Sequence, residues 1–214
     1  TEARWREELG RALAFGTDHL SLYQLTIEPG TRFKTLFDRG DIILPDEDLS
    51  ADLFAATAEQ TAAAGLPAYE ISNHARLGQE SRHNLTYWRY GDYAGIGPGA
   101  HGRRNGTATE RHKKPENWLA AIASQRHGIK AERILTPETR ATEALLMGLR
   151  LREGVDLDHI AALSGVAREA LVDEDAARRL AGHGLLTLDG SRLTVLPAGM
   201  LLLDAILPEV VALG

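Results

Sequence analysis

The stretch Tyr69–Gly102 decides how the rest of the chain is interpreted. It reads Tyr69-Glu-Ile-Ser-Asn-His-Ala75, then, after a short polar loop, His83-Asn-Leu-Thr-Tyr-Trp88, and then Gly91-Asp-Tyr-Ala-Gly-Ile-Gly-Pro-Gly-Ala-His-Gly102. Four of the five tyrosines and three of the eight histidines fall here, and glycine fills four of its last eight positions. Surface loops seldom concentrate aromatic, imidazole and glycine residues in this way. The stretch therefore predicts a site that receives a flat ligand or a cofactor.

The composition limits the classes of protein that the chain can belong to. It has 214 residues, of which 43% are hydrophobic and 25% charged, in the range of globular proteins. The net charge of −6 argues against a general affinity for nucleic acid. No cysteine is present, which excludes disulfides, thiolate zinc sites and an iron–sulfur cluster held by this chain. No apolar run has the length of a membrane span, and a cytoplasmic location is expected by default.

The N-terminal part predicts a piece of a larger α/β domain. Its first residues have the apolar spacing of a helix that ends near Gly16. His19–Ile27 is almost continuously apolar, as in a strand buried on both faces of a parallel sheet. A helix begins at Pro45-Asp46-Glu47-Asp48 and ends near Gly65, and Ala68–Ser72 follows as a short strand. Strand, helix and strand make one βα unit, which is too little to close a barrel.

The C-terminal part has a different character. Thr107–His112 predicts an edge strand, Pro115 begins a helix with Trp118, Leu119 and Ile122 facing inward, and the polar segment Gln125–Arg133 marks a domain boundary. Further helices are expected from Thr136 with Leu145, Leu146 and Leu149 inward, over about 157–163 and 173–181, and from Pro197 with Leu201, Leu202 and Ile206 inward, with a hairpin around Asp189-Gly190. Helices followed by a hairpin describe a winged-helix-like domain.

A winged helix raises the alternative of a non-catalytic, DNA-binding module. From Pro137 to Gly214 the sequence contains seven arginines and twelve acidic residues. A surface that binds phosphates needs the opposite balance of charge, so a structural or docking role is favoured over nucleic-acid binding.

His83 is the most informative single residue. A lone histidine is usually a satisfied core or surface group, but imidazole is also an axial ligand of haem iron. Tyr87 and Trp88 could supply flat apolar contacts, and Asn84 could fix the ring tautomer. No second histidine lies at the spacing of a zinc site.

The glycines of this stretch and its carboxylates are less specific. Gly97, Gly99 and Gly102 match the G-x-G-x-x-G pattern, but the following residues Arg103–Gly106 have the chemistry of a turn rather than of a helix, so a tight backbone path is favoured over a dinucleotide site. Acid–base roles for Glu70 and Glu80, which lie near histidines in the sequence, cannot be assigned from spacing.

Four segments resemble HemW and the HemN-related radical SAM proteins. They are His19–Thr31, Tyr69–Ala75, the His-Asn-x-x-Tyr-Trp segment His83–Trp88 and Asp92–His101. The resemblance implies a partial (β/α) barrel over residues 1–130 and a winged-helix-like HemN C-terminal domain over 131–214. It also implies that the intact protein uses S-adenosylmethionine and a [4Fe–4S] cluster, binds haem, and delivers it to respiratory proteins. The related oxygen-independent coproporphyrinogen III oxidase, which acts on a porphyrinogen, is the alternative function.

The resemblance also assigns site residues. His83 is the expected haem-iron ligand, with Asn84, Tyr87 and Trp88 beside it, and Gln24 and Leu25 are expected near S-adenosylmethionine by their position in the strand. The family's Cys-x-x-x-Cys-x-x-Cys motif is absent, and Ser81 stands where some relatives have cysteine. We therefore expect an N-terminally truncated chain that performs no radical chemistry alone. Apolar faces at Leu20–Ile27 and the first helix would be left uncovered, which favours a homodimer, strand swapping or poor solubility.

Overall fold

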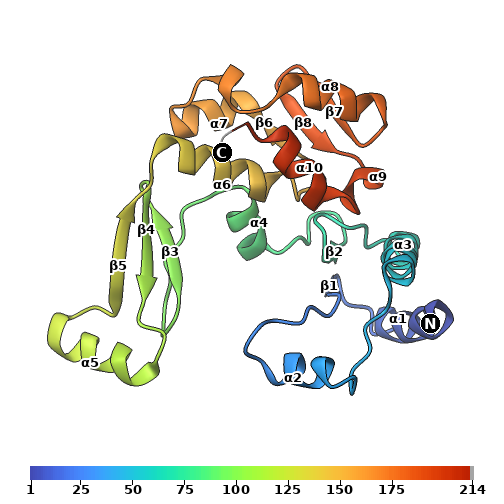
Figure 1. Cartoon of the computed structure of the whole chain (residues 1–214), viewed down its shortest axis with the longest axis horizontal. Helices are drawn as coiled ribbons and strands as arrows, with labels where there is room; N and C mark the ends of the chain where they lie inside the picture. The colour runs from blue at the N-terminus through green and yellow to red at the C-terminus, as the bar shows by residue number, and fades with distance from the viewer. Residues whose placement is uncertain (213–214) are drawn as a thin grey trace. The chain divides into compact units, whose positions relative to one another are not determined.

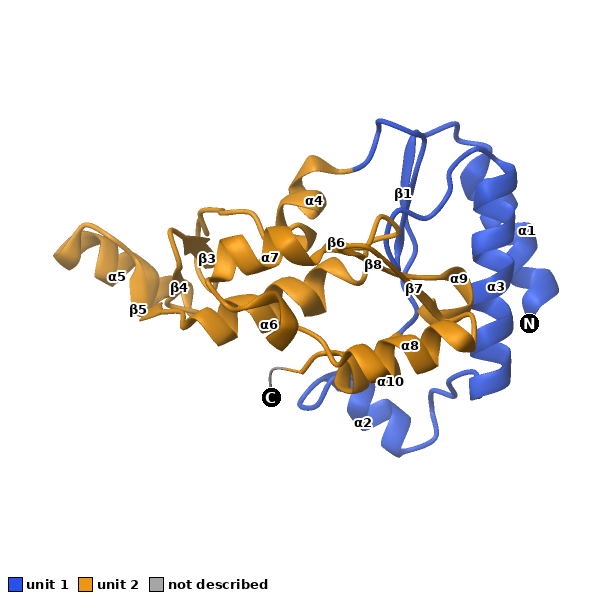
Figure 2. Cartoon of the chain, turned by 90° about the horizontal axis from the view of Figure 1, so that it is seen from above, with its two compact units in different colours: residues 1–80 blue, residues 81–214 orange. Residues whose placement is uncertain are grey.

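The computed structural model describes residues 1–212, which form two compact units, the first of residues 1–80 and the second beginning at residue 81 (Figures 1 and 2). Each unit mixes helices and strands, so the α/β class is confirmed. The two compact units do not test the domain boundary expected near residue 130, which stays a prediction. Among the described residues no helix is both long and apolar enough to cross a membrane.

The first unit packs two helices against each other beside a small ribbon of strands. Its elements are α1 (Glu2–Leu13), β1 (His19–Ser21), α2 (Arg32–Asp38), α3 (Glu47–Ala63) and β2 (Asn73–Ala75). The indole of Trp5 on α1 donates to the Thr57 hydroxyl on α3 at 2.8 Å, and Arg6 pairs with Glu59 at 2.7 Å. The predicted start of α3 is confirmed, because the Asp46 carboxylate accepts from the Leu49 amide at 2.8 Å.

The predicted parallel pairing in the first unit is wrong. β1 and β2 pair antiparallel, with Leu20 opposite His74. The strand expected over His19–Ile27 ends at Ser21, and Tyr23 is 74% and Leu25 53% exposed. Continuous apolar sequence indicates a buried strand only where strands lie on both sides, and the described residues provide none beyond Ser21. The strand expected at Ala68–Ser72 is instead a turn that leads into β2.

The second unit begins with a short helix and a three-stranded antiparallel sheet. α4 (Arg82–Trp88) precedes β3 (His101–Arg104), β4 (Thr107–Arg111), α5 (Pro115–Gln125) and β5 (Ile129–Ile134), with the strand order β3-β4-β5. In Figure 1, α5 lies at one end of this sheet and the chain leaves β5 from the other end.

Two predictions for this region are wrong, since β4 is the central strand and not an edge, and Leu119 on α5 is 59% exposed. The polar segment Gln125–Arg133 also includes most of β5, while the domain boundary expected there stays a prediction. A six-residue strand rich in charges escapes a sequence analysis that looks for apolar alternation. β5 is such a strand, since all its residues but Ile129 are exposed.

The remaining residues form the best-packed part of the chain. They comprise α6 (Pro137–Gly148), β6 (Val155–Asp156), α7 (Leu157–Ser164), η1 (Arg168–Ala170), α8 (Glu174–Gly182), β7 (Leu186–Asp189), β8 (Arg192–Val195), α9 (Pro197–Met200) and α10 (Leu203–Val210), with the strand order β6-β8-β7. The fully buried residues Leu145, Leu149 and Leu193 lie at its centre. The predicted helix starts and the hairpin are confirmed, with Thr136 and Asp173 as side-chain caps. Leu146, Leu201 and Leu202, predicted to face inward, are exposed.

Candidate functional site

Helix α4 positions the most informative histidine at the surface of the second unit. The Ser81 hydroxyl accepts from the Asn84 amide at 3.3 Å, which begins the helix one residue before Arg82. His83 and Tyr87, four residues apart, therefore share one face, and their ring centroids lie 4.7 Å apart in an edge-on arrangement. Tyr87 in turn meets Tyr93 edge-on at 4.4 Å. The three rings form a continuous stack, which we call the His83 stack.

A buried arginine holds the inner end of the His83 stack. Arg103 on β3 is 5% exposed, and its guanidinium carbon lies 3.4 Å from the ring centroid of Tyr90 and 5.6 Å from that of Tyr93. It donates to the Gly91 carbonyl at 3.1 Å and lies 3.8 Å from the Glu143 carboxylate on α6. The guanidinium thus joins the sequence motif to the C-terminal helices.

Tyr90 completes this connection. Its hydroxyl donates to Glu143 at 2.6 Å, and burial, followed by that hydrogen bond, raises the pKa of Tyr90. Burial likewise raises the pKa of Tyr93. Both phenols are therefore protonated at neutral pH, and Tyr90 acts as a hydrogen-bond donor rather than as an anion.

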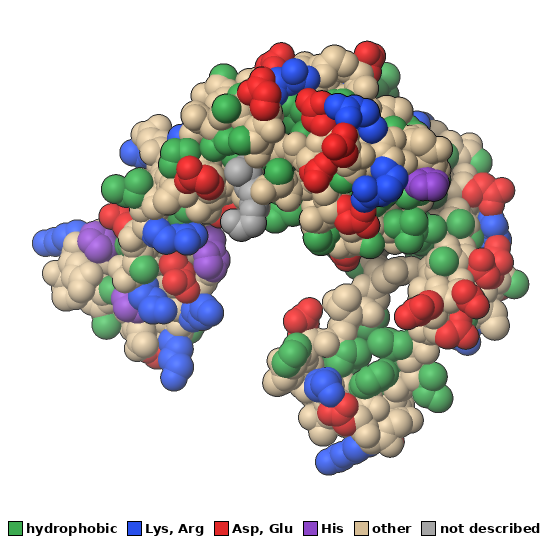
Figure 3. Space-filling model, turned by 45° about the horizontal axis from the view of Figure 1, so that its top comes forward, with side chains coloured by type: hydrophobic (Ala, Val, Ile, Leu, Met, Phe, Trp, Pro, Cys, Tyr) green, Lys and Arg blue, Asp and Glu red, His purple; other side chains and the backbone are tan. Residues whose placement is uncertain are grey.

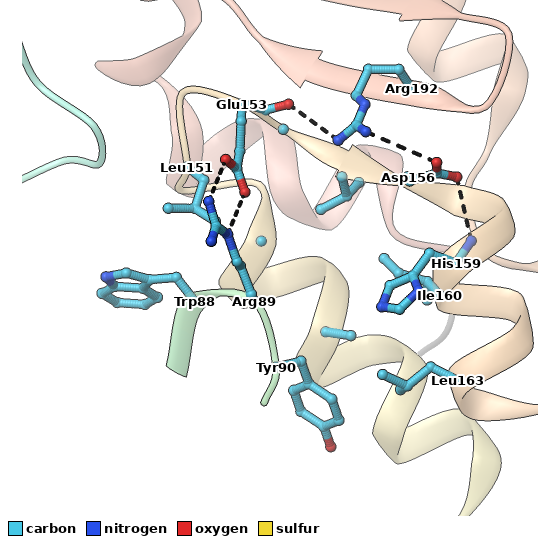
Figure 4. Close-up of a pocket in the computed structure, with 14 residues that line it drawn as sticks. Trp88, Arg89, Tyr90, Leu151, Glu153, Asp156, His159, Ile160, Leu163 and Arg192 are labelled. Atoms are coloured by element: carbon cyan, nitrogen blue, oxygen red, sulfur yellow. Dashed lines mark hydrogen bonds and ion pairs between the residues drawn. The ribbon is translucent and has the colours of Figure 1, made fainter. Parts of the chain in front are cut away.

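The end of α4 borders a cavity of about 350 Å³ between α6, β6 and α7 (Figure 4). Its floor is apolar, with Leu151, Ile160 and Leu163, and Trp88 lies at its edge, 5.8 Å from the Arg150 guanidinium. Arg89 makes two bonds to Glu153, at 2.7 and 2.8 Å. That hydrogen bonding, and then the positive charge of Arg89, lowers the pKa of Glu153.

The opposite wall of this cavity is also fixed by charge. Arg192 donates to the Glu153 carbonyl at 3.4 Å and lies 3.9 Å from Asp156. The amide of His159 donates to the Asp156 carboxylate at 3.3 Å, and this bond is the main cause of the lowered pKa of Asp156. The cavity rim carries balanced charges that already pair with each other, so the cavity is a weak candidate for a charged ligand.

The structure brings together only part of the predicted haem-site residues. His83 is exposed and lies against Tyr87, whereas Trp88 borders the separate cavity described above. Over residues 1–212, no hydrogen bond or ion pair is formed by the His83 ring. Within the same range no group of three or more His, Cys, Asp or Glu side chains is arranged to hold a metal ion.

The residues predicted near S-adenosylmethionine lie in the first unit. Gln24 and Leu25 both line a cavity of about 420 Å³, and the Gln24 amide donates to the Ser50 carbonyl at 2.8 Å. His74 lines the same cavity, and burial, with a smaller effect of His19, lowers the pKa of His74 to about 4. Its Nδ1 lies 2.9 Å from the Thr61 hydroxyl.

The glycines of the motif allow close backbone approach. A Cβ atom at Gly95 would lie 2.1 Å from the His101 carbonyl oxygen, and one at Gly102 would lie 2.7 Å from the Thr109 hydroxyl. Gly97 and Gly99 have positive φ angles of 93° and 73°. A strand follows these residues and not a helix, so the interpretation as a tight backbone path is confirmed and no dinucleotide fingerprint is present.

Sequence reasoning missed Arg103 and Glu143. Arg103–Gly106 was expected to be a turn, but only Asn105 and Gly106 turn, while Arg103 and Arg104 belong to β3. No local pattern separates a buried arginine from an exposed one. The only available signal was the position of Arg103 just after the glycine-rich segment.

Comparisons with known proteins agree with these motifs. Residues 135–202 match the HemN C-terminal domain family. The chain is 34% identical over 195 residues to the heme chaperone HemW of Mycobacterium tuberculosis, which covers 91% of this chain and 48% of that protein. It is 33% identical over 216 residues to the mitochondrial radical S-adenosyl methionine domain-containing protein 1 of Danio rerio, which covers 96% of this chain and 49% of that protein.

The chain belongs to the HemW/HemN-related radical SAM family. Its fold is similar to that of the HemN coproporphyrinogen III oxidase from Escherichia coli, with a TM-score of 0.74, 18% identity, and coverage of 97% of this chain and 51% of that one. The chain spans about half the length of the curated relatives it matches. It has no cysteine, so the HemW/HemN cluster motif is absent from it.

Proposed function

We propose that the chain contributes the haem-binding part of a HemW-like haem chaperone, with His83 as the iron ligand. The observation that carries the proposal is the exposed His83 imidazole, which has no competing hydrogen bond within residues 1–212 and is held edge-on by Tyr87. An imidazole nitrogen must be accessible and uncharged to bind iron. The relatives named heme chaperone support the same conclusion.

We infer from the contacts of His83 how the chain's own residues would serve this role. Tyr87 restricts the His83 ring, Tyr93 restricts Tyr87, and the buried Arg103 restricts Tyr93, so the imidazole is oriented before any ligand arrives. Asn84 and Trp88, on the same short helix, are the other expected contacts with the macrocycle. Bound haem would supply an iron centre for axial ligation.

The proposals for the domains, cofactors and partners of the intact protein rest on the family to which the chain belongs. We propose that residues 1–130 correspond to part of a (β/α) barrel and residues 131–214 to a winged-helix-like HemN C-terminal domain. In the intact protein, S-adenosylmethionine would lie near Gln24 and Leu25, and a [4Fe–4S] cluster would need thiolates that this chain does not contain. The proposed recipients of the haem are respiratory proteins.

A haem titration of the chain tests the role of His83. We expect His83→Ala to lose the absorption change of axial ligation and to bind haem about tenfold more weakly or worse, which corresponds to about 1.4 kcal/mol. His127→Ala, which removes another exposed histidine of the same unit, is the matched control and should behave like the unchanged chain. Equal spectra and affinities for the unchanged chain and His83→Ala would remove His83 as the ligand.

The alternative function is that of an oxygen-independent coproporphyrinogen III oxidase. The fold similarity to that enzyme from Escherichia coli is the observation that favours it. Turnover of the porphyrinogen by the intact protein with a rebuilt cluster would establish this alternative. Haem binding through His83 without turnover would support the chaperone instead.

A further inference from the structure

Positive charge is concentrated in one part of a chain that is acidic as a whole. Residues 101–134 contain eight Lys or Arg and three Asp or Glu, together with three His, whereas the chain has 24 Lys or Arg and 30 Asp or Glu. These residues form β3, β4, α5 and β5, which we call the basic lobe. Figure 3 shows blue and purple side chains gathered on this lobe. The negative net charge of the whole chain hides this local excess of positive charge, and the excess needs an explanation of its own.

The basic lobe contains a cavity of about 470 Å³ over one face of its sheet. Arg104 lies opposite Thr107, and Thr109 lies opposite Glu132, so these side chains share a face by register. The amide of Arg111 donates to the Ala100 carbonyl, which extends the β3–β4 pairing and brings Arg111 to the same face. The cavity is therefore lined by arginines, two threonine hydroxyls and a single carboxylate.

The cations of this cavity have unused hydrogen-bonding capacity. Arg104 makes no ion pair or side-chain hydrogen bond with any residue in the range 1–212. Arg111 uses its Nε to donate to the Gly95 carbonyl at 2.5 Å, so its terminal amino groups remain available as donors to a ligand. Arg103 also borders the cavity, but the register places its side chain on the opposite face of the sheet, where it contacts Tyr90 and Glu143. Arg104 and Arg111 are therefore the cations whose donors are available to a ligand in this cavity.

The cavity adjoins the His83 stack. Tyr93 lines the cavity, pairs with Arg103 through two backbone hydrogen bonds, and carries the inner ring of the stack. The absence of a Cβ at Gly102 lets the backbone at Gly95 cross this face of the sheet. The stack and the cavity therefore meet at one residue, Tyr93.

We propose that this cavity binds the carboxylate side chains of a tetrapyrrole, with Arg104 and Arg111 as the pairing groups. The proposal rests on the proposed haem-binding function and names the part of the ligand that these residues recognise. Guanidinium groups match carboxylates in charge and in planar geometry, and each can form two parallel hydrogen bonds. The threonine hydroxyls at 107 and 109 supply further donors. Glu132 opposes a bound carboxylate by repulsion.

Metal-free protoporphyrin IX is the probe that isolates this site, because it carries the two propionates but no iron for His83. We expect Arg104→Gln to weaken its binding about tenfold, and Arg111→Lys to weaken it by a smaller factor, as measured by quenching of porphyrin fluorescence. Arg133→Gln is the matched control, since Arg133 pairs with Ala108 and lies on the opposite face of the same sheet. The dimethyl ester of protoporphyrin IX should bind all these variants alike.

A gain of affinity provides the sharper test. Glu132→Gln removes the only carboxylate among the described residues that line the cavity and should tighten the binding of the free acid severalfold, and raised salt should reduce the difference. Equal affinities of Arg104→Gln and the unchanged chain, or an equal loss with the dimethyl ester, would overturn the carboxylate site. Loss of the haem spectrum in His83→Ala together with unchanged Arg104→Gln binding would overturn this inference alone. The reverse pattern would overturn the assignment of His83 and leave the carboxylate site standing.

Discussion

At the scale of single residues, His74 shows how burial sets a pH dependence. In the folded chain the pKa of His74 is lowered from 6.5 to about 4, mainly because burial penalises the charged ring. The His74 ring therefore binds a proton below about pH 6.5 in the unfolded chain, but only near pH 4 in the folded chain. The contribution of His74 to the free energy of unfolding is complete above pH 6.5. It decreases as the pH falls toward 4, by about 3 kcal/mol at most.

The measurement is urea denaturation at several pH values. We expect the free energy of unfolding to fall between pH 6.5 and pH 4 and this slope to flatten in His74→Phe, which keeps an aromatic ring but has no titrating group. His127→Gln removes an exposed histidine and should leave the slope unchanged. An unaltered slope in His74→Phe would show that His74 titrates normally in the folded chain.

At the scale of elements, the backbone at Gly95 can cross β3 closely because glycine has no side chain. A Cβ at Gly95 would meet the His101 carbonyl oxygen at 2.1 Å, and a backbone atom cannot rotate away as a flexible side chain can. We expect Gly95→Ala to destabilise the second unit by about 3 kcal/mol. Gly182→Ala in α8 is the control, because nothing lies within 4 Å of that position and alanine favours the helix. Denaturation followed by the fluorescence of Trp88 and Trp118, in a Trp5→Phe background, reports on this unit.

The same scale explains which elements could be predicted from the sequence. Helix starts depend on local bonds, so Asp46, Thr136 and Asp173 marked them correctly. The hairpin at Gly190 is equally local. Strand pairing depends on neighbours that are distant in sequence, which is why His19–Ile27 was assigned wrongly to a parallel sheet.

The residues of the candidate site also differ in whether the sequence could predict their contacts. His83 and Tyr87 could be paired from their helical spacing, since they lie four residues apart. Arg103 could not be found, because its burial depends on Tyr90 and on Glu143, forty residues further along the chain. Residues that orient a site through tertiary contacts leave little trace in the local sequence.

At the scale of the whole molecule, the first unit leaves large apolar side chains uncovered. Phe15, Tyr23 and Ile43 are each at least 74% exposed, and within residues 1–212 the segment 23–27 pairs with no strand. Exposed apolar surface next to unpaired backbone favours association between chains. We therefore expect reversible self-association that increases with protein concentration.

Light scattering over a range of concentrations measures this association. The double variant Phe15→Ser and Ile43→Ser should shift the average mass toward that of the monomer, because it removes apolar surface without touching the buried core of either unit. Leu119→Ser, at an exposed apolar position on α5 in the second unit, is the control and should leave the mass unchanged if the first unit carries the contact. A monodisperse monomer of the unchanged chain at high concentration would contradict the prediction, since uncovered apolar surface of this kind would then cost too little to drive association.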